Sequence, residues 1–311
     1  IVLIIYVTYT LIFAALLMLS GLDIFTSFHT VFTVFSTTGY TIISASSMPL
    51  SAVAVITLMM FSSGLSFVFH FKLLLFIKNI EWKKLLSRKP RRILIPIAEM
   101  PWKTLFTIEL KGYLILIAAL TIAFWIASGT NPFQSFYHVV DFSSSCGLGV
   151  VDFPHLGDAA KMLLVVAMFI GPMSFSIGGG VRVQRVIIFA KTLLNLPKAL
   201  KTRKIPKIEI NGETINSKDI SFHLLVIGLF ALISIVGAWS LAFYGYNSVD
   251  AIVESVSAIT TTGDSPTVLT PAFPLFPKLM LMMLMLVGRM EILPVFMAFS
   301  RGEIREDVSR F

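Results

Sequence analysis

Cysteine is nearly absent from this sequence, which has Cys146 alone among its 311 residues. A single cysteine excludes a disulfide framework within the chain and a metal site built from a cysteine cluster. The sequence also lacks the Gly-x-Ser-x-Gly and His-Glu-x-x-His patterns, so these routes to a nucleophile or a catalytic zinc ion are missing. These absences count against a disulfide-stabilised protein and against the common hydrolases.

Charge is also scarce, since Asp, Glu, Lys and Arg make up 14% of the residues while hydrophobic residues make up 56%. A soluble protein would build its core from amphipathic segments, but here apolar runs of roughly 20 residues recur, which is the length needed to cross a bilayer. We therefore predict a membrane protein. The formal net charge of +8 does not indicate a nucleic-acid partner, because the positive residues gather in linkers between the apolar runs.

The beginning of the sequence has no methionine, no basic flank and no small-residue cleavage site, and Ile1 already lies inside an apolar run. A secretory signal peptide would carry a basic flank and a cleavage site, so the first segment is not one. We expect instead that this sequence is a piece of a longer chain.

A pattern that occurs three times is what the sequence does contain. In each copy an Asp or Asn stands sixteen residues before a glycine, small residues precede that glycine, and the first residues of the copies are 108 and 116 apart. The copies run from Asp23 to Gly39, from Asn131 to Gly147 and from Asn247 to Gly263. One Thr-Thr-Gly arises easily by chance or as an ordinary turn between helices, but three aligned copies indicate an internal repeat.

Each copy is predicted to begin with a helix too short to cross the membrane. Residues 25–35 would form roughly 16 Å of helix, about half of the ~30 Å bilayer core. Such a helix must enter and stop, so each unit is read as a span, a half-helix, a glycine loop and a second span. The spans are expected at residues 1–20, 50–76, 108–128, 161–170 with a continuation at 181–194, 220–244 and 276–300. The predicted units are residues 1–90, 91–206 and 207–311.

The basic residues alternate with the glycine loops along the chain. Residues 78–103 contain eight Lys or Arg and residues 198–218 contain six, whereas residues 21–49, 129–160 and 245–277 contain none. By the positive-inside rule, the two basic linkers and the C-terminal tail lie in the cytoplasm and the glycine loops face outward. We expect a multi-pass protein of the cell (inner) membrane.

The repeat also predicts a kind of chemistry. A half-helix followed by a non-helical loop leaves backbone carbonyl groups without helical partners inside the membrane, where unsatisfied polar groups are costly. Rings of carbonyl oxygens can replace the water shell of a cation, and the C-terminal end of each half-helix adds partial negative charge. Glycine permits the backbone angles that point these carbonyls at an axis. The pattern therefore indicates a cation pathway.

The three loops resemble a known family. Ser36–Tyr40, Ser144–Leu148 and Thr260–Asp264, together with Gly178–Gly180 and Gly288–Glu291, are similar to the Trk/Ktr/HKT superfamily of cation transporters, closest to the bacterial TrkH and KtrB type. The resemblance covers nearly the whole chain. It implies an all-α membrane protein with four such units around a central ion pore and a broken second helix in the third unit. That break follows the second unit here, so these resemble family units two, three and four, three of the expected four.

The resemblance implies a selectivity filter and a gate at named positions. The filter residues would be Thr37, Thr38, Gly39, Ser145, Cys146, Gly147, Thr261, Thr262 and Gly263. The gating residues would be Gly171, Ser174, Ser176, Gly178, Gly179, Gly180 and Arg289. Pro172, Phe175 and Ile177 depart from the small residues common in family gating loops. The alternatives are a helix-packing glycine cluster for the gate and a buried structural pair for Arg289 with Glu291.

The implied function is potassium uptake, with K⁺ as the transported ion at the filter, conducted passively or by symport, and with no cofactor or transition metal in this chain. Relatives form homodimers and work with a cytoplasmic nucleotide-binding regulatory subunit, and membrane lipid would surround the protein. A sodium-permeable or non-selective transporter of the same superfamily and a non-conducting scaffold stay open. An intramembrane enzyme would use Asp141, His138 or Glu254, but these residues are not repeated across the units.

Overall fold

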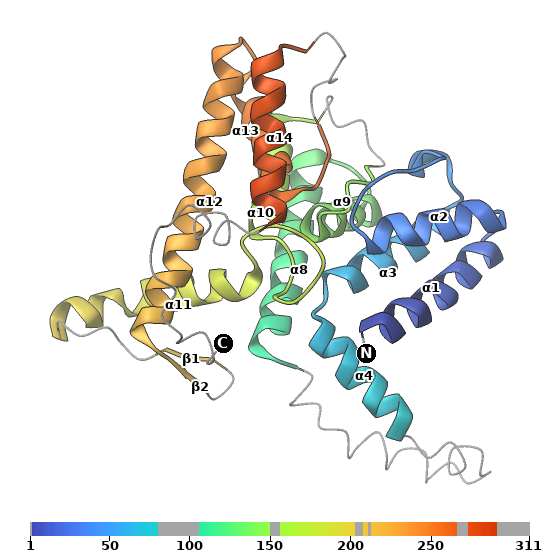
Figure 1. The fold of residues 1–311 in the computed structure, drawn as a ribbon, viewed down its shortest axis with the longest axis horizontal. Coiled ribbons are helices and arrows are strands. Elements are labelled where there is room, and N and C mark those ends of the chain that lie inside the picture. Colours follow the sequence, from blue (N-terminus) through green and yellow to red (C-terminus); the bar gives the residue numbers. More distant parts are fainter. Residues whose placement is uncertain are drawn as a thin grey trace, which may run out of the picture.

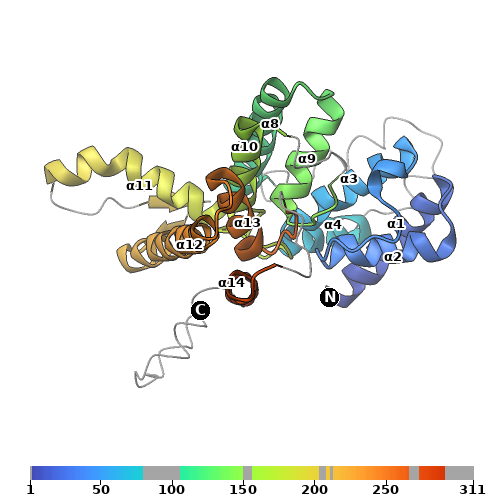
Figure 2. The ribbon, with the colours of Figure 1, turned by 90° about the horizontal axis from the view of Figure 1, so that it is seen from above.

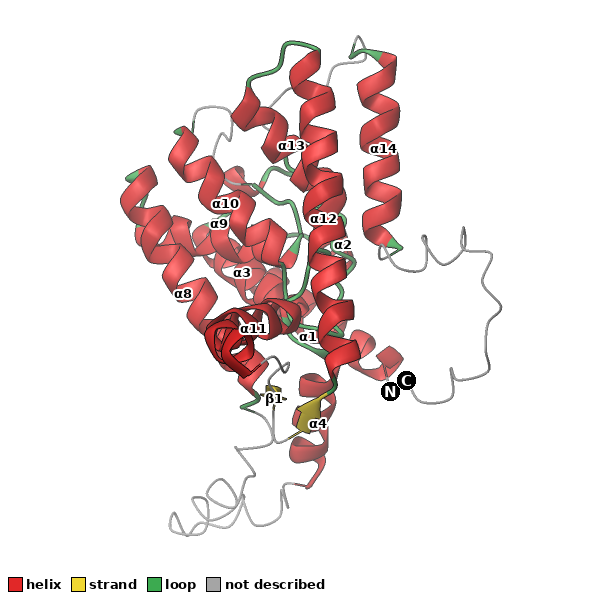
Figure 3. Ribbon diagram, turned by 90° about the vertical axis from the view of Figure 1, so that its left-hand side faces the viewer, coloured by secondary structure: helices red, strands yellow, loops and turns green. Residues whose placement is uncertain are grey.

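The computed structural model describes residues 2–79, 106–149, 156–202, 208–210, 213–265 and 273–290. Helices make up most of this part of the chain, and the strands in it are two segments of three residues each (Figure 3). The predicted all-α membrane class is confirmed. A longer helix, a short helix and a further helix follow one another three times, so the helices are described in three sets. The predicted unit boundaries at residues 90 and 206 lie outside the described residues.

The first set, drawn in blue in Figure 1, has a sharp bend between its last two helices. It contains α1 (Val2–Leu19), the short α2 (Ile24–Phe35), a 3-10 turn (Ala45–Ser47), α3 (Leu50–Gly64) and α4 (Phe67–Asn79). Residues 50–76, predicted as one span, form two helices, α3 and α4, which are bent by 104° at the break between them. Ser66 starts the new helix, since its hydroxyl accepts a hydrogen bond from the Val68 N–H at 3.2 Å.

The second set contains the predicted broken helix. Its elements are α8 (Ile108–Ser128), the short α9 (Pro132–Ser144), α10 (Asp158–Ile170) and α11 (Val183–Thr202). Residues 171–182 form no helix, as the sequence predicts. After this break α11 leaves to the side instead of continuing α10 (Figure 1), and it extends past Pro197 into the second basic linker.

The third set begins with a β-hairpin that was not predicted from the sequence. β1 (Ile208–Ile210) pairs antiparallel with β2 (Glu213–Ile215) inside the second basic linker. The helices that follow are α12 (Ser217–Phe243), the short α13 (Ser248–Thr260) and α14 (Leu275–Arg289), and all three pack on one another. The second half of the span expected at residues 276–300 lies outside the described residues.

Three of the described helices, α1, α8 and α12, are long and apolar enough to cross a membrane. They expose large apolar side chains, with Leu3 75%, Ile126 76% and Trp239 71% accessible. Surfaces of this kind are unfavourable in water and suit the hydrocarbon of a bilayer. The exposed faces of these helices are therefore read as lipid-facing.

The second set links the other two. It contacts the first set through α3 and α9 and the third through α10 and α13, and the view from above shows it beside both (Figure 2). One apolar core is shared by all three sets, with Phe13 and Met60 from the first, Phe142 from the second and Val256 from the third. The ends of the three short helices are thereby held within one packed region, where the glycine loops meet.

Candidate functional site

The three glycine loops have the same backbone conformation. The residue two places before each glycine has positive φ, as Thr37 (52°), Ser145 (59°) and Thr261 (55°). The glycines follow with φ values of 73°, 70° and 91° at Gly39, Gly147 and Gly263, and the residue between has no positive φ. Positive φ is uncommon for residues other than glycine and costs energy. Its presence at matching positions in all three loops means that the repeat extends to the backbone geometry.

The loops approach one another so closely that side chains would not fit at two of the glycines. A Cβ at Gly39 would lie 2.7 Å from Cys146 O and 3.0 Å from Gly147 O. A Cβ at Gly147 would overlap Thr262 O, whereas one at Gly263 would meet no atom of the described residues within 4 Å. Carbonyl oxygens of the second loop thus face the first glycine, and a carbonyl of the third loop faces the second glycine. This arrangement brings oxygen atoms from neighbouring loops toward one place.

The half-helices direct their C-terminal ends at these loops. Their last residues Ser144 and Thr260, and Thr262 beyond them, are 0%, 0% and 2% exposed. The C-terminal end of a helix carries partial negative charge from its unpaired carbonyls. The site therefore concentrates electronegative groups, which favour a cation.

The N-terminal ends of the half-helices partly differ from expectation. Asp23 caps α2, its carboxylate accepting from the Thr26 N–H at 3.1 Å, and hydrogen bonding with Thr26 lowers the pKa of Asp23 below its ordinary value. Asn131 and Asn247 occupy the same positions, but their side chains make no capping hydrogen bond. Near the start of α13, an ion pair of 2.7 Å between Lys161 and Asp250 ties this half-helix to α10.

The glycine segment of the broken helix lies against the ends of two half-helices. A Cβ at Gly178 would lie 2.5 Å from Ser144 O, and one at Gly179 would overlap Thr260 O. A Cβ at Gly171 would overlap Gly179 O, so the two sides of this loop also touch. The absence of side chains is what allows the loop to lie directly beside the glycine loops.

Hydrogen bonds hold the loop between residues 171 and 182 in place. The Arg182 guanidinium donates to Met173 O (3.3 Å), Ser176 O (3.1 Å) and Ser176 Oγ (3.0 Å). The N–H of Ser174 donates to the Glu109 carboxylate at 2.5 Å. Phe175 has positive φ (57°) and a side chain 74% exposed, so this bulky residue points away from the loop. The predicted gating residues from Gly171 to Gly180 are therefore together in one well-bonded segment, and Arg289 comes to it from α14.

Two further hydrogen bonds connect this segment to the bend between α3 and α4. The Met173 N–H donates to Gly64 O at 3.1 Å, and the Phe67 N–H donates to Phe175 O at 2.9 Å. The sequence offered no signal for this connection, because its partners are more than one hundred residues apart. It joins the broken helix of the second set to the bent pair of the first.

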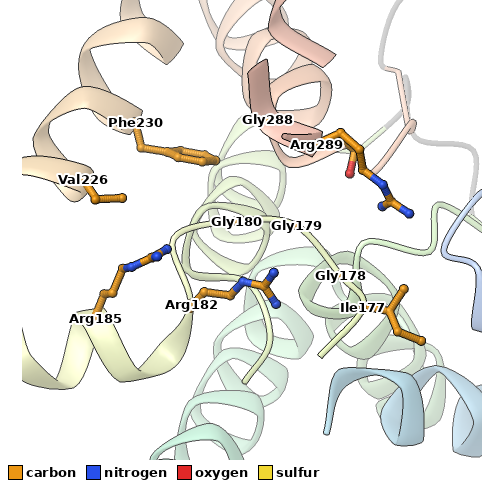
Figure 4. A pocket seen from close by; sticks show the side chains of 11 residues that line it. Ile177, Gly178, Gly179, Gly180, Arg182, Arg185, Val226, Phe230, Gly288 and Arg289 are labelled. Carbon is orange, nitrogen blue, oxygen red and sulfur yellow. The ribbon is translucent and has the colours of Figure 1, made fainter. Parts of the chain in front are cut away.

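Arg289 lies between the glycine segment and the first glycine loop. Its guanidinium donates to Thr37 Oγ1 at 3.3 Å and to Ser36 O at 3.4 Å. It also lines a cavity of about 180 Å³ whose walls include Gly178–Gly180 and Arg182 (Figure 4). The alternative pairing of Arg289 with Glu291 lies outside the described residues. A fixed positive charge thus stands beside the place where the electronegative loops meet.

The residues considered for an intramembrane enzyme do not converge. The Glu254 carboxylate accepts from the Ser265 hydroxyl at 2.5 Å, and Asp141 accepts from the Leu148 N–H, so each binds its own loop. In the described part of the chain, both nitrogens of the buried His138 are without a hydrogen-bond partner, and His, Cys, Asp and Glu form no group of three or more that could hold a metal ion. The loop-binding role of Asp141 was missed, although its position, six residues before the glycine, matches that of Thr33.

Comparison with known proteins places these features in a family. The uncharacterized cation transporter MJ1485 of Methanocaldococcus jannaschii is 27% identical over 304 residues, covering 95% of this chain and 58% of that protein. The Trk system potassium uptake protein TrkH of Halomonas elongata is 29% identical over 203 residues, 60% of this chain and 40% of that protein. The Ktr system potassium uptake protein D of Bacillus subtilis is 26% identical over 162 residues, 51% of this chain and 34% of that protein. The chain thus spans about a third to three fifths of these relatives.

The fold has a solved counterpart. The crystal structure of the potassium transporter TrkH from Vibrio parahaemolyticus superposes with a TM-score of 0.77 at 18% sequence identity, over 96% of this chain and 63% of that one. At this identity the likeness concerns the fold. The sequence model of the TrkH family, which is described as a cation transport protein, matches residues 1–304 of this chain. Because that match covers almost the whole chain, the chain belongs to the TrkH family of cation transport proteins, which are transporters rather than enzymes.

Proposed function

We propose that this protein takes up potassium across the membrane, and that K⁺ passes where the three glycine loops meet. One observation carries the proposal: carbonyl oxygens of the second and third loops point at the glycines of the first and second. Carbonyl oxygens in such an arrangement can replace the hydration shell of a monovalent cation. The printed names of two relatives, both potassium uptake proteins, support K⁺ as the ion.

In this proposal the filter consists of Thr37–Gly39, Ser145–Gly147 and Thr261–Gly263. Buried hydroxyl groups and half-helix ends supply further electronegative atoms around the path. Among the residues that the structure describes, none has an atom within 4 Å of the Cβ position of Gly263, and a fourth loop on this side would complete the ring. Selection between K⁺ and Na⁺ then depends on how well the carbonyl oxygens match each ion.

The loop between residues 171 and 182, with Arg289, is proposed as the gate. The loop lies against Ser144 O and Thr260 O, at the inner ends of two half-helices, where it obstructs the path. The guanidinium of Arg289 repels a cation at the same level.

Two other parts of the proposal come from the resemblance: a homodimer, and a cytoplasmic nucleotide-binding regulatory subunit that acts on the basic linkers.

The proposal is tested with the full-length protein in liposomes, by measuring uptake of ⁸⁶Rb⁺ with K⁺ or Na⁺ as competitor. Inhibition by K⁺ and little inhibition by Na⁺ is the expected result. Equal inhibition by both ions would identify a sodium-permeable or non-selective transporter. No uptake by folded protein, with a regulatory subunit supplied, would leave the scaffold function.

A further inference from the structure

The second glycine loop is backed by a carboxylate that the ion path does not use. Asp141 of α9 is fully buried, and the Leu148 N–H donates to both of its oxygens, at 3.0 and 3.1 Å. The N–H of Gly147 also faces this carboxyl group and favours its ionised form. A buried carboxylate is costly unless donors surround it, and an ionised one accepts at both oxygens. Here the Leu148 N–H is the hydrogen-bond donor, and the Gly147 N–H beside it faces the same group.

These bonds determine which way the loop carbonyls point. The peptide bonds of the described residues are trans, so the N–H of one residue and the carbonyl of the preceding residue point in opposite directions. Because the N–H groups of Gly147 and Leu148 turn toward Asp141, the carbonyls of Cys146 and Gly147 turn away from it. These are the two oxygens that face Gly39, at 2.7 and 3.0 Å from its Cβ position. Asp141 and the first glycine loop thus lie on opposite sides of the second.

The next carbonyl in the same loop points the other way. The Tyr137 hydroxyl donates to Leu148 O at 2.6 Å, which holds that oxygen against the half-helix. In the first loop the Thr33 hydroxyl donates to Tyr40 O at 2.7 Å. Leu148 and Tyr40 each follow the glycine of their loop. In the second loop the carbonyls that face Gly39 therefore end at Gly147, and in both loops the carbonyl after the glycine is bound by a half-helix side chain.

We infer that Asp141 is a positioning residue, which holds the carbonyls of Cys146 and Gly147 toward the ion path. The inference rests on the proposed function, because it assigns those carbonyls to the filter. The matching positions of the first and third loops, six residues before the glycine, hold Thr33 and Ser257. Only the second loop has a carboxyl group there, and its bonds to the Leu148 N–H, with the Gly147 N–H beside it, orient the adjoining peptide planes.

Asp141→Asn is the informative variant. An amide keeps the size of the side chain but has one acceptor oxygen, and its NH₂ group would face a backbone N–H. Tyr137→Phe is the matched control. It removes one buried hydrogen bond from the same half-helix to the same residue, Leu148, but acts on a carbonyl that does not face the path.

Both variants are compared with the wild type by ⁸⁶Rb⁺ uptake into liposomes with K⁺ and Na⁺ as competitors. Asp141→Asn is expected to reduce the K⁺/Na⁺ preference about tenfold, while Tyr137→Phe stays within about twofold. The preference is a ratio, so it does not depend on how much folded protein is present. Reduced uptake with unchanged preference in both variants would mean that Asp141 only stabilises the fold, and would overturn the inference.

A cryo-EM map of the Asp141→Asn protein decides the question without transport. At least one of the two peptide planes, Cys146–Gly147 or Gly147–Leu148, is expected to rotate, and unrotated planes would overturn the inference. If wild-type protein takes up no ⁸⁶Rb⁺, the proposed function fails while the map still reports on Asp141. If the Asp141→Asn protein does not fold, a map of the Asp141→Glu protein is used instead. Peptide planes that stay unchanged although the Glu carboxylate does not contact these N–H groups would also overturn the inference.

Discussion

Gly39, Gly147 and Gly263 share a left-handed backbone but differ in the space around them. The Cβ positions of Gly39 and Gly147 are occupied by backbone oxygens of neighbouring loops, whereas that of Gly263 is open. Glycine is therefore required at the first two sites for two reasons, backbone angle and close approach. At the third site the angle alone requires it.

This difference predicts different effects of one substitution. Gly147→Ala must push the second and third loops apart, so we expect little folded protein and loss of ⁸⁶Rb⁺ uptake. Gly263→Ala has room for its methyl group and meets only a conformational cost of about 1 kcal/mol, so it should fold and show its effect as an altered K⁺/Na⁺ preference. Size-exclusion profiles and competitive uptake measure both results.

Gly129→Ala is the control for the conformational cost. Gly129 has φ 66° with no atom within 4 Å of its Cβ position, and it lies at the end of α8. The Gly129→Ala protein should fold and keep the wild-type ion preference. Wild-type folding and preference in the Gly147→Ala protein would contradict the close contact between the loops.

Among the elements, the broken helix shows what the sequence could and could not predict. The bounds of α1, α2 and α8 follow from the lengths of their apolar runs, and the interruption after Ile170 follows from its glycines. The bend at Ser66 and the hairpin of β1 and β2 were not predicted. The bend is joined to loop residues more than one hundred positions away, and local propensity contains no information on such contacts. The hydrogen bonds from the Leu148 N–H to Asp141 were not predicted either, because they form only when the loop folds back on α9.

The loop between α10 and α11 should move more easily without Arg182. Arg182→Ala removes three hydrogen bonds to Met173 and Ser176, each contributing about 0.5–1.5 kcal/mol or more. If the loop is the gate, the basal ⁸⁶Rb⁺ flux should increase severalfold, and deletion of residues 174–179 should increase it further. Arg185→Ala is the comparison variant, because it removes a hydrogen bond to Val181 O at the end of the loop, away from Met173 and Ser176, and should change the flux less. Unchanged flux in the Arg182 variant and the deletion would rule out the gate.

At the scale of the whole molecule, the fold class, the three-fold repeat of short helices and the family were all predictable from the sequence. They depend on composition and on a pattern repeated at long intervals, which local errors do not disturb. Orientation in the membrane is a separate prediction from the positions of Lys and Arg. It places the turn between α2 and α3 outside and the β-hairpin inside.

Cysteine labelling tests this orientation. Cys146 is the single cysteine, so Cys146→Ser provides a background for one new cysteine at a time. Ser47→Cys, between α2 and α3, should react with a membrane-impermeant maleimide in right-side-out vesicles. Asn216→Cys, between β2 and α12, should react only after the membrane is opened; both wild-type residues are exposed. The reverse pattern would invert the topology, and with it the direction assigned to uptake.

The two hydrogen bonds between the bend of the first set and the loop of the second have a mechanical consequence. The loop cannot shift by more than a bond length unless it breaks both, at about 0.5–1.5 kcal/mol each, or carries Gly64 and Phe67 with it. In the second case α4 rotates about the 104° bend as a rigid helix, and its C-terminal end at the first basic linker moves with the loop. If this end lies in the cytoplasm and the loop is the gate, as proposed, a modest force on the end would displace the loop, so the two helix sets would move as one cooperative unit.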